Sequence, residues 1–349
     1  MIRSGGLAAS IAFAATLTLG IQPSAQTPQQ PVFRSNANVV TVPVSVRSKG
    51  NPVNGLTPAD FAVFDNDVAQ TVEIVSAESV AADITLVVET SKAMSDYVGS
   101  IDGQVKKIAG MIRPSDRFEV IGVSTYVETL LPMRPMSEQT SMPALKAGGL
   151  SSINDALVAA LLREPDQERP HLVIALTDSI DTMSATSMAT VISAAKYSSS
   201  ILAIAWITMD LIPQGPLNPP LTSTSAERVS THARVSARLA DVSFARTEPA
   251  TRPWLAHYEP RLGRTILAFD PLKDAARLTG GDLYFPGIFT NRTASAIFDK
   301  LYSDYRQRYL LRYTTPGVTT GGWHEIRVSI PSLPKAEISA KRGYFVEKK

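Results

Sequence analysis

Acidic side chains follow two apolar runs of the chain, and they are the first candidates for chemistry. Residues 84–88 form one run, which ends in Glu89. Residues 171–176 form a second run, which leads to Asp178 and then to Asp181. Asp178 and Asp181 could pair as a general acid and base. Carboxylates at strand ends more often serve as ligands or loop caps, so a hydrolase that uses them is the less favoured alternative.

The other chemistry-bearing residues form no recognised catalytic or zinc-binding motif. Asp65-Asn66-Asp67 is similar to the start of a calcium loop, but the spacing of an EF-hand is absent and a hairpin turn is favoured. No Gly-x-Ser-x-Gly motif or P-loop occurs. The histidines, which form no HExxH or His-x-His pair, are His171, His232, His257 and His324. We therefore expect a protein that is not an enzyme, without catalytic residues or an organic cofactor.

Length and composition suit a globular protein with a sizeable core. The chain has 349 residues, of which 44% are hydrophobic and 19% charged, so one large domain and a smaller one are expected. A net charge of +2 with scattered basic residues argues against a nucleic-acid partner. The chain has no cysteine, so core burial alone must hold it together.

The first residues have the pattern of a secretory signal peptide. Arg3 precedes an apolar stretch at residues 6–21, and Ala25 marks the expected cleavage position. The alternative is a membrane anchor, but the stretch barely reaches the roughly 20 residues needed to span a bilayer. Residues 26–36 predict a flexible lead-in. We expect a bacterial protein that is secreted or periplasmic and has no stable membrane span once the signal is removed.

Both ends of the mature chain predict short antiparallel strands. In residues 37–79, valines alternate with polar residues, and the pattern predicts strands at 38–46, 61–64 and 68–75. Residues 307–349 show the same alternation of apolar and polar residues, and strands are expected at 307–313, 324–330 and 337–346. The two ends are therefore expected to pair into one small β-sandwich-like module.

Between these ends, residues 80–306 alternate strands with helices. Strands are expected at 84–88, 117–123, 171–176, 201–207 and 283–285, and helices at 98–111, 155–162, 185–197, 272–278 and 294–305. This order predicts an α/β fold with a doubly wound, mostly parallel sheet, inserted in the β module. Residues 209–264 are rich in proline and too long for an ordinary connection, so they are expected to be an inserted subregion or a partly disordered excursion.

Four segments, in this order, resemble a von Willebrand factor A-like domain with a Rossmann-like sheet. They are the loop at residues 86–94, the strand entry at 114–118, the Leu-Thr-Asp strand end at 172–178, and the helix and glycine turn at 272–281. Residues 33–35 with 39–46, then 55–61, and finally 341–345 resemble the bacterial exported group called VWFA-related acidobacterial domain proteins. The resemblance covers nearly all of the mature chain except residues 209–264.

The resemblance implies a metal-ion-dependent adhesion site at the carboxyl ends of the parallel strands. In such a site Mg²⁺ or Ca²⁺ is held by oxygen atoms, and one position stays open for a ligand carboxylate. The ligand positions of the family fall on Glu89, Ser91, Ser151 and Asp178, with Ser152 as a rival to Ser151. The site is degenerate, because Glu89 replaces an aspartate, Ala93 a serine and Ser179 a glycine.

The implied function is that of an exported, adhesion-type module that binds a protein or cell-surface ligand at this edge. In the metal-free alternative, Glu89 and Asp178 form a hydrogen-bonded polar patch, and the ammonium group of Lys92 supplies the missing positive charge. A second alternative is a cell-envelope scaffold or assembly component.

Overall fold

The computed structural model describes residues 39–139, 141–164, 166, 168–207, 270–284, 291–315 and 321–346. They belong to one compact unit, Asn38–Lys349. The expected signal peptide, the lead-in at 26–36 and the expected insertion at 209–264 lie outside these residues. In the part of the chain described, no helix is long and apolar enough to cross a membrane.

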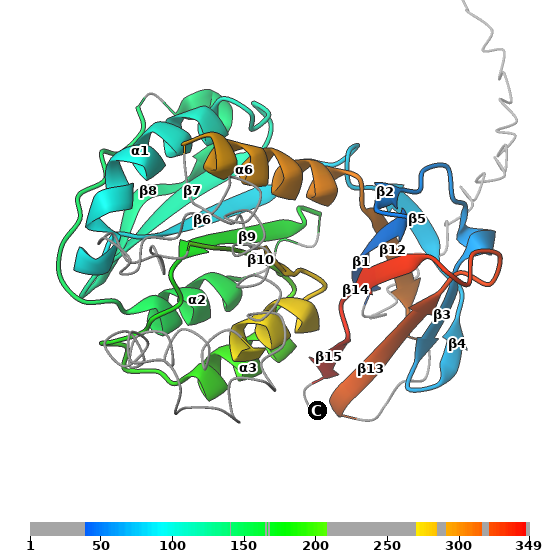
Figure 1. Ribbon diagram of the computed structural model, residues 1–349. Coiled ribbons are helices and arrows are strands. Elements are labelled where there is room, and N and C mark those ends of the chain that lie inside the picture. The colour runs from blue at the N-terminus through cyan, green and yellow to red at the C-terminus, as the bar shows by residue number, and fades with distance from the viewer. Residues whose placement is uncertain are drawn as a thin grey trace, which may run out of the picture. The chain divides into compact units, whose positions relative to one another are not determined.

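The α/β part has a six-stranded sheet in the order β11-β10-β9-β6-β7-β8 (Figure 1). Its neighbouring strands are parallel except β7 and β8. The strands are β6 (Asp83–Glu89), β7 (Arg117–Val123), β8 (Val127–Pro135), β9 (His171–Thr177), β10 (Ile201–Trp206) and β11 (Leu283–Tyr284). Sequence order runs outward in both directions from the β6/β9 pair, so this pair is the switch point of a doubly wound sheet, where ligands usually bind.

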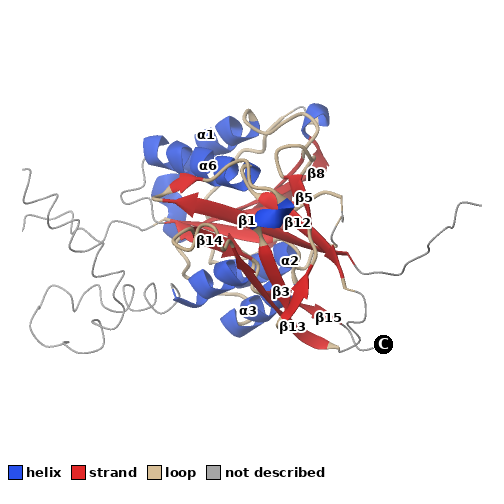
Figure 2. Ribbon diagram, turned by 90° about the vertical axis from the view of Figure 1, so that its right-hand side faces the viewer, coloured by secondary structure: helices blue, strands red, loops and turns tan. Residues whose placement is uncertain are grey.

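Helices cover both faces of this sheet, as Figure 2 shows. Helices α1 (Ser95–Ala109) and α6 (Asn291–Arg306) lie on one face, and α2 (Ile153–Leu161) and α3 (Met188–Tyr197) on the other. A further helix at residues 270–278 packs into the cluster of α2 and α3. Short 3-10 helices occur at η1 (Pro58–Asp60), η2 (Lys92–Met94) and η3 (Met136–Glu138).

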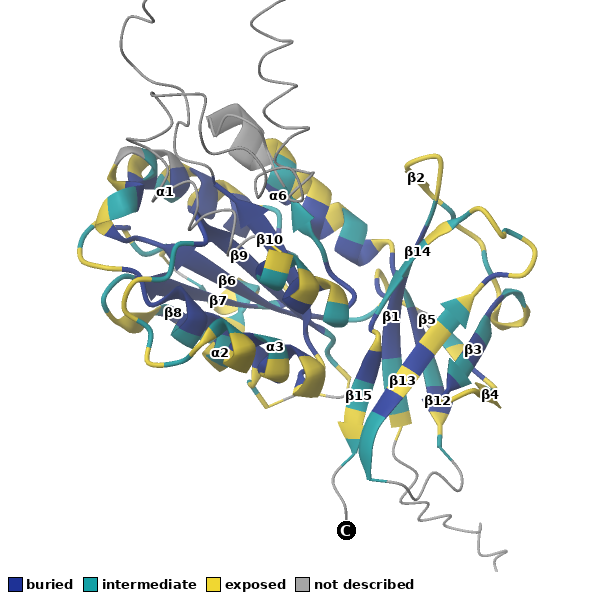
Figure 3. Ribbon diagram, turned by 60° about the horizontal axis from the view of Figure 1, so that its bottom comes forward, coloured by how far each residue is buried: buried dark blue, intermediate teal, exposed yellow. Residues whose placement is uncertain are grey.

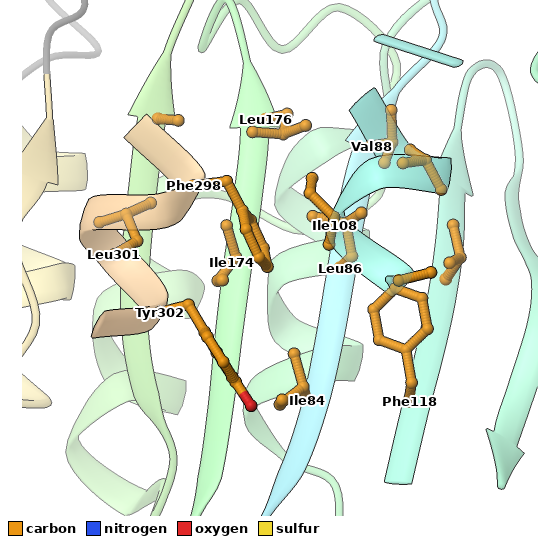
Figure 4. Packing of buried hydrophobic residues seen from close by; sticks show 14 of the residues in the cluster. Ile84, Leu86, Val88, Ile108, Phe118, Ile174, Leu176, Phe298, Leu301 and Tyr302 are labelled. Carbon is orange, nitrogen blue, oxygen red and sulfur yellow. The ribbon is translucent and has the colours of Figure 1, made fainter. Parts of the chain in front are cut away.

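Alternate residues of each buried strand serve the two faces of the sheet. In β6, Ile84 and Leu86 pack with α1 and α6, whereas Val87 packs with α2. Figure 4 shows Phe298 and other side chains of α6 over the strands. Figure 3 shows β6, β9 and β10 as buried, and exposed residues on the outer sides of α2 and α3. Burial on both faces explains why these strands read as continuous apolar runs.

The β module has two sheets whose strands come from both chain ends. One sheet has the order β14-β1-β12-β5, with β2 paired to β1, and the other β15-β13-β3-β4. The strands are β1 (Val39–Ser48), β2 (Asn51–Pro52), β3 (Ala62–Asp65), β4 (Val68–Gln70), β5 (Glu73–Ser76), β12 (Tyr309–Thr314), β13 (Gly322–Ser329), β14 (Glu337–Ala340) and β15 (Gly343–Val346). Val42, Val44, Val63 and Leu311 belong to one shared core. The predicted fold class, an α/β domain inserted in a β module made by both ends, is therefore confirmed.

The sequence missed one strand, and two other local expectations were wrong. Strand β8 had no counterpart in the sequence reading, because Leu131 is its only buried residue and no clear apolar pattern marks it. The single strand expected at 68–75 is two strands, β4 and β5, in different sheets. The single strand expected at 337–346 is also two, β14 and β15. The chain changes sheets at the buried residue Lys341, whose ammonium group donates to the carbonyl oxygen of Ser198 at 2.6 Å.

Candidate functional site

The candidate site lies at the carboxyl edge of the sheet, where β6 and β9 end side by side. Glu89 is the last residue of β6, and Thr177 is the last residue of β9, directly before Asp178. The two strands are parallel neighbours, with Val88 paired to Leu176. Their polar ends therefore meet at the same edge, as the sequence predicted for Glu89 and Asp178.

The Glu89 carboxylate is fully buried and accepts hydrogen bonds at both oxygens. Its Oε1 accepts from the Ser91 hydroxyl at 2.8 Å. Its Oε2 accepts from the Thr177 hydroxyl at 2.5 Å and from the backbone N–H of Asp178 at 3.2 Å. Buried carboxylates need such donors, because burial of an unpaired charge is costly. Glu89 thus ties the first loop to the end of β9, and the extra length of glutamate over aspartate allows this reach.

Thr177 is a site residue that the sequence reading missed. It was quoted only as part of the Leu-Thr-Asp strand end and given no role, but its side chain donates to Glu89 and is fully buried. Its oxygen also accepts from the backbone N–H of Ser179 at 2.8 Å. The available signal was its position, since a hydroxyl residue at the end of a buried strand lies beside the polar end of the neighbouring strand.

The loop that carries Ser151 joins the other two loops. The backbone N–H of Lys92 donates to the carbonyl of Gly149 at 2.9 Å, and the Ser151 carbonyl accepts from the N–H groups of Thr182 and Met183 at 2.9 and 2.8 Å. The Ser152 hydroxyl donates to the carbonyl of Thr125 at 2.9 Å. These bonds hold the loops after β6, before α2 and after β9 in one assembly.

The two rival serines have different environments. The Ser151 hydroxyl is buried and has no hydrogen-bond partner among the described residues, whereas Ser152 is committed to its loop. A buried hydroxyl without a partner calls for an explanation, and an absent ligand is one. Of the pair, Ser151 is therefore the residue whose oxygen can take part in a site.

Lys92 does not replace a cation in this structure. Its side chain is exposed, and within the described ranges it forms no ion pair. The charge of Glu89 is instead stabilised by hydroxyl and backbone donors. The polar patch expected for the metal-free alternative is thus present, but the part assigned to the Lys92 ammonium was wrong.

Ser179 occupies a backbone conformation that favours glycine. Its φ is +65°, in the left-handed region, and its hydroxyl is buried with no hydrogen-bond partner in the described part of the chain. This is the position at which the resemblance expects glycine. The backbone around it is held by an Asx-type bond from the Ile180 N–H to Asp178 Oδ1 at 2.8 Å and by Trp206, which donates to the Asp178 carbonyl at 3.1 Å. Local strain of this kind concentrates at functional sites.

Two further carboxylates shape the loops around the site. Asp181 accepts from the backbone N–H groups of Asn154 and Ser184, at 3.1 and 3.2 Å, and from the Ser184 hydroxyl. Asp155 accepts from the N–H groups of Ala185 and Thr186 and from the Thr186 hydroxyl. Burial raises the pKa of Asp155, but these hydrogen bonds outweigh it and hold the pKa below its ordinary value. Both residues act as loop caps, which is the alternative we set against acid–base pairing for Asp181.

Large apolar side chains are exposed on loops at the same edge of the sheet as the four candidate metal ligands, which we call the polar centre. Tyr126, Leu150 and Met183 are 78%, 50% and 52% exposed. Their loops are hydrogen-bonded to one another, since the Leu150 N–H donates to the Thr125 hydroxyl at 3.0 Å and the Met183 N–H to Ser151. We call these three residues the apolar rim.

The described histidines lie away from this edge. His171 begins β9, at the opposite edge of the sheet, and is held between the Ser200 and Thr85 hydroxyls at 2.7 and 2.9 Å. Burial lowers the pKa of His171 to about 4. His324 lies in the β module, where its Nδ1 is 2.9 Å from Asp65. His232 and His257 fall outside the described residues.

The oxygen atoms at the edge are of the type that a hard divalent cation binds, but they are fewer than a complete site of this kind would supply. The Ser91 hydroxyl gives its hydrogen to Glu89 and keeps its lone pairs, and the Ser151 oxygen has no partner. Ala93 supplies no oxygen. Within the described ranges, no group of three or more His, Cys, Asp or Glu side chains could hold a metal ion. Any cation here would thus depend on hydroxyl oxygens as well as on carboxylates.

Comparisons of this chain with known proteins found similarity only to solved structures. No family model and no curated protein matches the sequence. The chain is similar to a von Willebrand factor type A structure from Catenulispora acidiphila, with 12% identity, 90% of this chain and 65% of that chain covered, and a TM-score of 0.44. It is also similar to the ArnB paralog VWA2 from Sulfolobus acidocaldarius, with 11% identity, coverage of 88% and 76%, and a TM-score of 0.39.

A third similar structure is proximal thread matrix protein 1 from the mussel byssus, with a zinc-occupied MIDAS motif. The identity is 16%, the likeness covers 40% of this chain and 39% of that chain, and the TM-score is 0.32. This chain thus spans less than two thirds of the Catenulispora and mussel chains. The sheet order and the polar strand ends of the chain itself give its α/β part a von Willebrand factor A-like fold.

Proposed function

We propose that this protein is an exported, non-enzymatic interaction module that binds a protein or cell-surface ligand at the carboxyl edge of its α/β sheet. The apolar rim of Tyr126, Leu150 and Met183 carries this proposal. Large apolar side chains that gather on a soluble surface mark contact sites, and tyrosine and methionine are enriched in interfaces. Here three of them stand on three loops that are hydrogen-bonded together, so the surface is prearranged for a partner.

The polar centre adds a directional contact to this apolar surface. We propose Glu89, Ser91, Ser151 and Asp178 as the residues that would hold Mg²⁺ or Ca²⁺. A bound cation would supply an open position for a carboxylate of the partner. Glu89 would also orient the Ser91 hydroxyl, which donates to its Oε1. Without a cation, the same loops would bind through the apolar rim alone.

The loop contacts favour binding over hydrolysis. Asp181 is engaged by Ser184 and Asn154 as a cap, and neither described histidine lies at the carboxyl edge. A hydrolase that uses Asp178 and Asp181 would have no histidine base among the described residues here. The second candidate, a cell-envelope scaffold, would use the same fold without a ligand at this edge.

We further propose the domain organisation and destination that follow from the sequence. Residues 1–25 would be removed as a signal peptide, and residues 26–36 would form a lead-in. Residues 37–79 and 307–349 would form the β module, and residues 80–306 the von Willebrand factor A-like domain with its insertion at 209–264. The mature protein would then be secreted or periplasmic.

A pair of serine variants tests the cation. Calorimetric titration of the mature protein with Mg²⁺, Mn²⁺ and Ca²⁺ should give a binding heat that Ser151→Ala and Asp178→Ala abolish. Ser152→Ala is the matched control and should keep the heat, because the Ser152 hydroxyl is bonded within its loop. If the unaltered protein gives no binding heat, the cation part of the proposal is wrong, and binding through the apolar rim is the part that stays. Equal loss in both serine variants would contradict the choice of Ser151.

A charge on the apolar rim tests the binding face. Leu150→Asp should abolish retention of the mature protein on the envelope fraction of the bacterium that produces it. Val68→Asp is the control, since Val68 is 61% exposed on β4 of the β module. Circular dichroism must show both variants folded. Retention that survives Leu150→Asp would support the scaffold alternative instead.

A further inference from the structure

A buried arginine between α6 and β12 has no partner for its charge among the described residues. Arg308 is 6% exposed. Its Nε and Nη1 atoms are buried and donate no hydrogen bond within the described ranges, and no ion pair there includes Arg308. Buried charges in folded proteins are normally paired, so this guanidinium needs an explanation.

The position of Arg308 follows from the alternation of β12. Tyr309 and Leu311 point into the core between the two sheets of the β module. Arg308 and Leu310 occupy the alternate positions, and so belong to the face of the sheet away from that core. Arg308 is therefore excluded from the apolar core, and it lies where the end of α6 meets this sheet.

The nearby acid is already shared by two other cations. Asp304, one turn before Arg308, pairs with Arg47 of β1 through Oδ1 and with Lys300 through Oδ2, the latter at 2.8 Å. Both of its oxygens are thus used. Burial lowers the pKa of Arg308, and neighbouring Tyr284 and Asp304 only partly oppose this. Because a guanidinium stays protonated in proteins, the group cannot avoid its cost by losing a proton.

A cavity adjoins this residue. Its volume is about 540 Å³, in the range that holds small ligands, and Arg308 lies in its wall. The wall also contains Arg306, which pairs with Asp116, and Glu78, which is exposed. Asp116 pairs with Arg113 as well, at 3.4 Å. Asn54 and Gln307 add amide groups. With two arginines and one acid in the wall, a singly charged anion suits the cavity better than a multiply charged one.

We propose that Arg308 binds the carboxylate of a small organic acid in this cavity. The ligand carries one negative charge, which completes the pairing of the guanidinium. Its remaining polar groups face Asn54 and Gln307. Nε and Nη1 are buried in the structure, so contact between these atoms and the acid requires the arginine side chain to turn toward the cavity. This site is separate from the carboxyl edge and does not depend on the proposed function.

Acetate and glycolate are the probes that test this site. The melting temperature of the mature protein is measured with each sodium salt against sodium chloride at equal ionic strength. A rise of about 2–3 °C is expected at ten times the dissociation constant, because a ligand of the folded state stabilises it. Absence of a rise with both carboxylates up to about 50 mM would overturn the proposal, since weaker binding has no significance.

Arg308→Met is the informative variant, because it keeps the apolar stem and removes the charge. It should lose the response to carboxylate, and it should melt at a higher temperature than the unaltered protein in chloride alone. Arg327→Met, on an exposed arginine paired with Asp67, is the control that keeps the response. A full response in Arg308→Met would overturn the assignment. An equal or larger rise with inorganic phosphate in the unaltered protein would overturn the choice of a singly charged carboxylate.

Discussion

The Thr177 hydroxyl donates a 2.5 Å hydrogen bond to the carboxylate of Glu89, across the switch point of the parallel sheet. The bond joins the ends of β6 and β9, which are the two strands at which the sheet changes direction. The Ser91 hydroxyl donates to the other carboxylate oxygen. Together the two bonds fix the loop after β6 against the loop after β9. The polar centre of the carboxyl edge is thus organised around Glu89.

Removal of the Thr177 hydroxyl should destabilise the fold. Thr177→Val keeps the shape of the side chain but leaves a buried carboxylate with one donor fewer. A hydrogen bond to a charged group contributes about 1.5–3 kcal/mol, so the free energy of unfolding should fall by that amount. Urea unfolding measures it. Thr129→Val, on the exposed strand β8, should change stability by less than about 0.5 kcal/mol. Equal effects of the two variants would contradict the importance of the bond.

Glycine at position 179 should stabilise the protein. Ser179 has a φ of +65° and a buried hydroxyl without a partner among the described residues, and Ser179→Gly removes both costs. A left-handed conformation costs a residue with a Cβ about 1–2 kcal/mol. Glycine also has greater conformational freedom in the unfolded chain, which offsets part of the stability gained by removing this cost. The net gain should be about 1 kcal/mol in thermal or urea unfolding. A loss of stability would show that the Ser179 side chain has a stabilising contact.

Restoring the residues that the resemblance expects should strengthen a cation site. Glu89→Asp with Ala93→Ser recreates Asp-x-Ser-x-Ser in the first loop. The shorter carboxylate leaves Thr177, and the new hydroxyl adds an oxygen, so calorimetry should show at least about tenfold tighter Mg²⁺ binding than in the unaltered protein. Ala93→Ser alone is the control for the added oxygen. A double variant that binds Mg²⁺ no better than the unaltered protein would mean that the loops do not form a cation site.

The apolar pattern was enough to predict most of the fold. Strands such as β6 and β9 are buried on both faces, so they read as unbroken apolar runs, and their polar successors Glu89 and Asp178 marked the edge of the sheet. Strand β8 was missed because only Leu131 in it is buried. The change of sheet at Lys341 was missed because it depends on a tertiary contact with Ser198.

The candidate site was predicted in position but not in its bonding. The resemblance placed Ser151 or Ser152 in the site, but only the bond from Ser152 to Thr125 and the unpartnered hydroxyl of Ser151 among the described residues separate them. The donors to Glu89 include the Thr177 hydroxyl, for which the end of the buried strand was the available signal, and a backbone N–H, which no residue pattern reveals. The exposed side chain of Lys92 likewise follows from the turn of η2 and not from the sequence spacing.

His171 should make stability fall between about pH 6.5 and pH 4. Its pKa is lowered from 6.5 to about 4 by burial, so the unfolded chain takes up a proton in this range and the folded protein does not. The contribution of the neutral, buried His171 to the free energy of unfolding is complete above its ordinary pKa of 6.5. It is lost as the pH falls toward the lowered pKa of about 4. The shift corresponds to about 3 kcal/mol. Urea unfolding at several pH values should show this slope, and His171→Gln should flatten it. An unchanged slope in the variant would assign it to other groups.

The central claim is that the carboxyl edge of the sheet is the binding face, and site-specific photo-cross-linking tests it most directly. A photoreactive amino acid replaces Leu150 of the apolar rim or, as the control, Val68 of β4, in cells that produce the protein. The account predicts a discrete cross-linked species from position 150 that is absent from position 68 and is lost when Met183→Asp is added. The same species from both positions, or none from position 150, would contradict it.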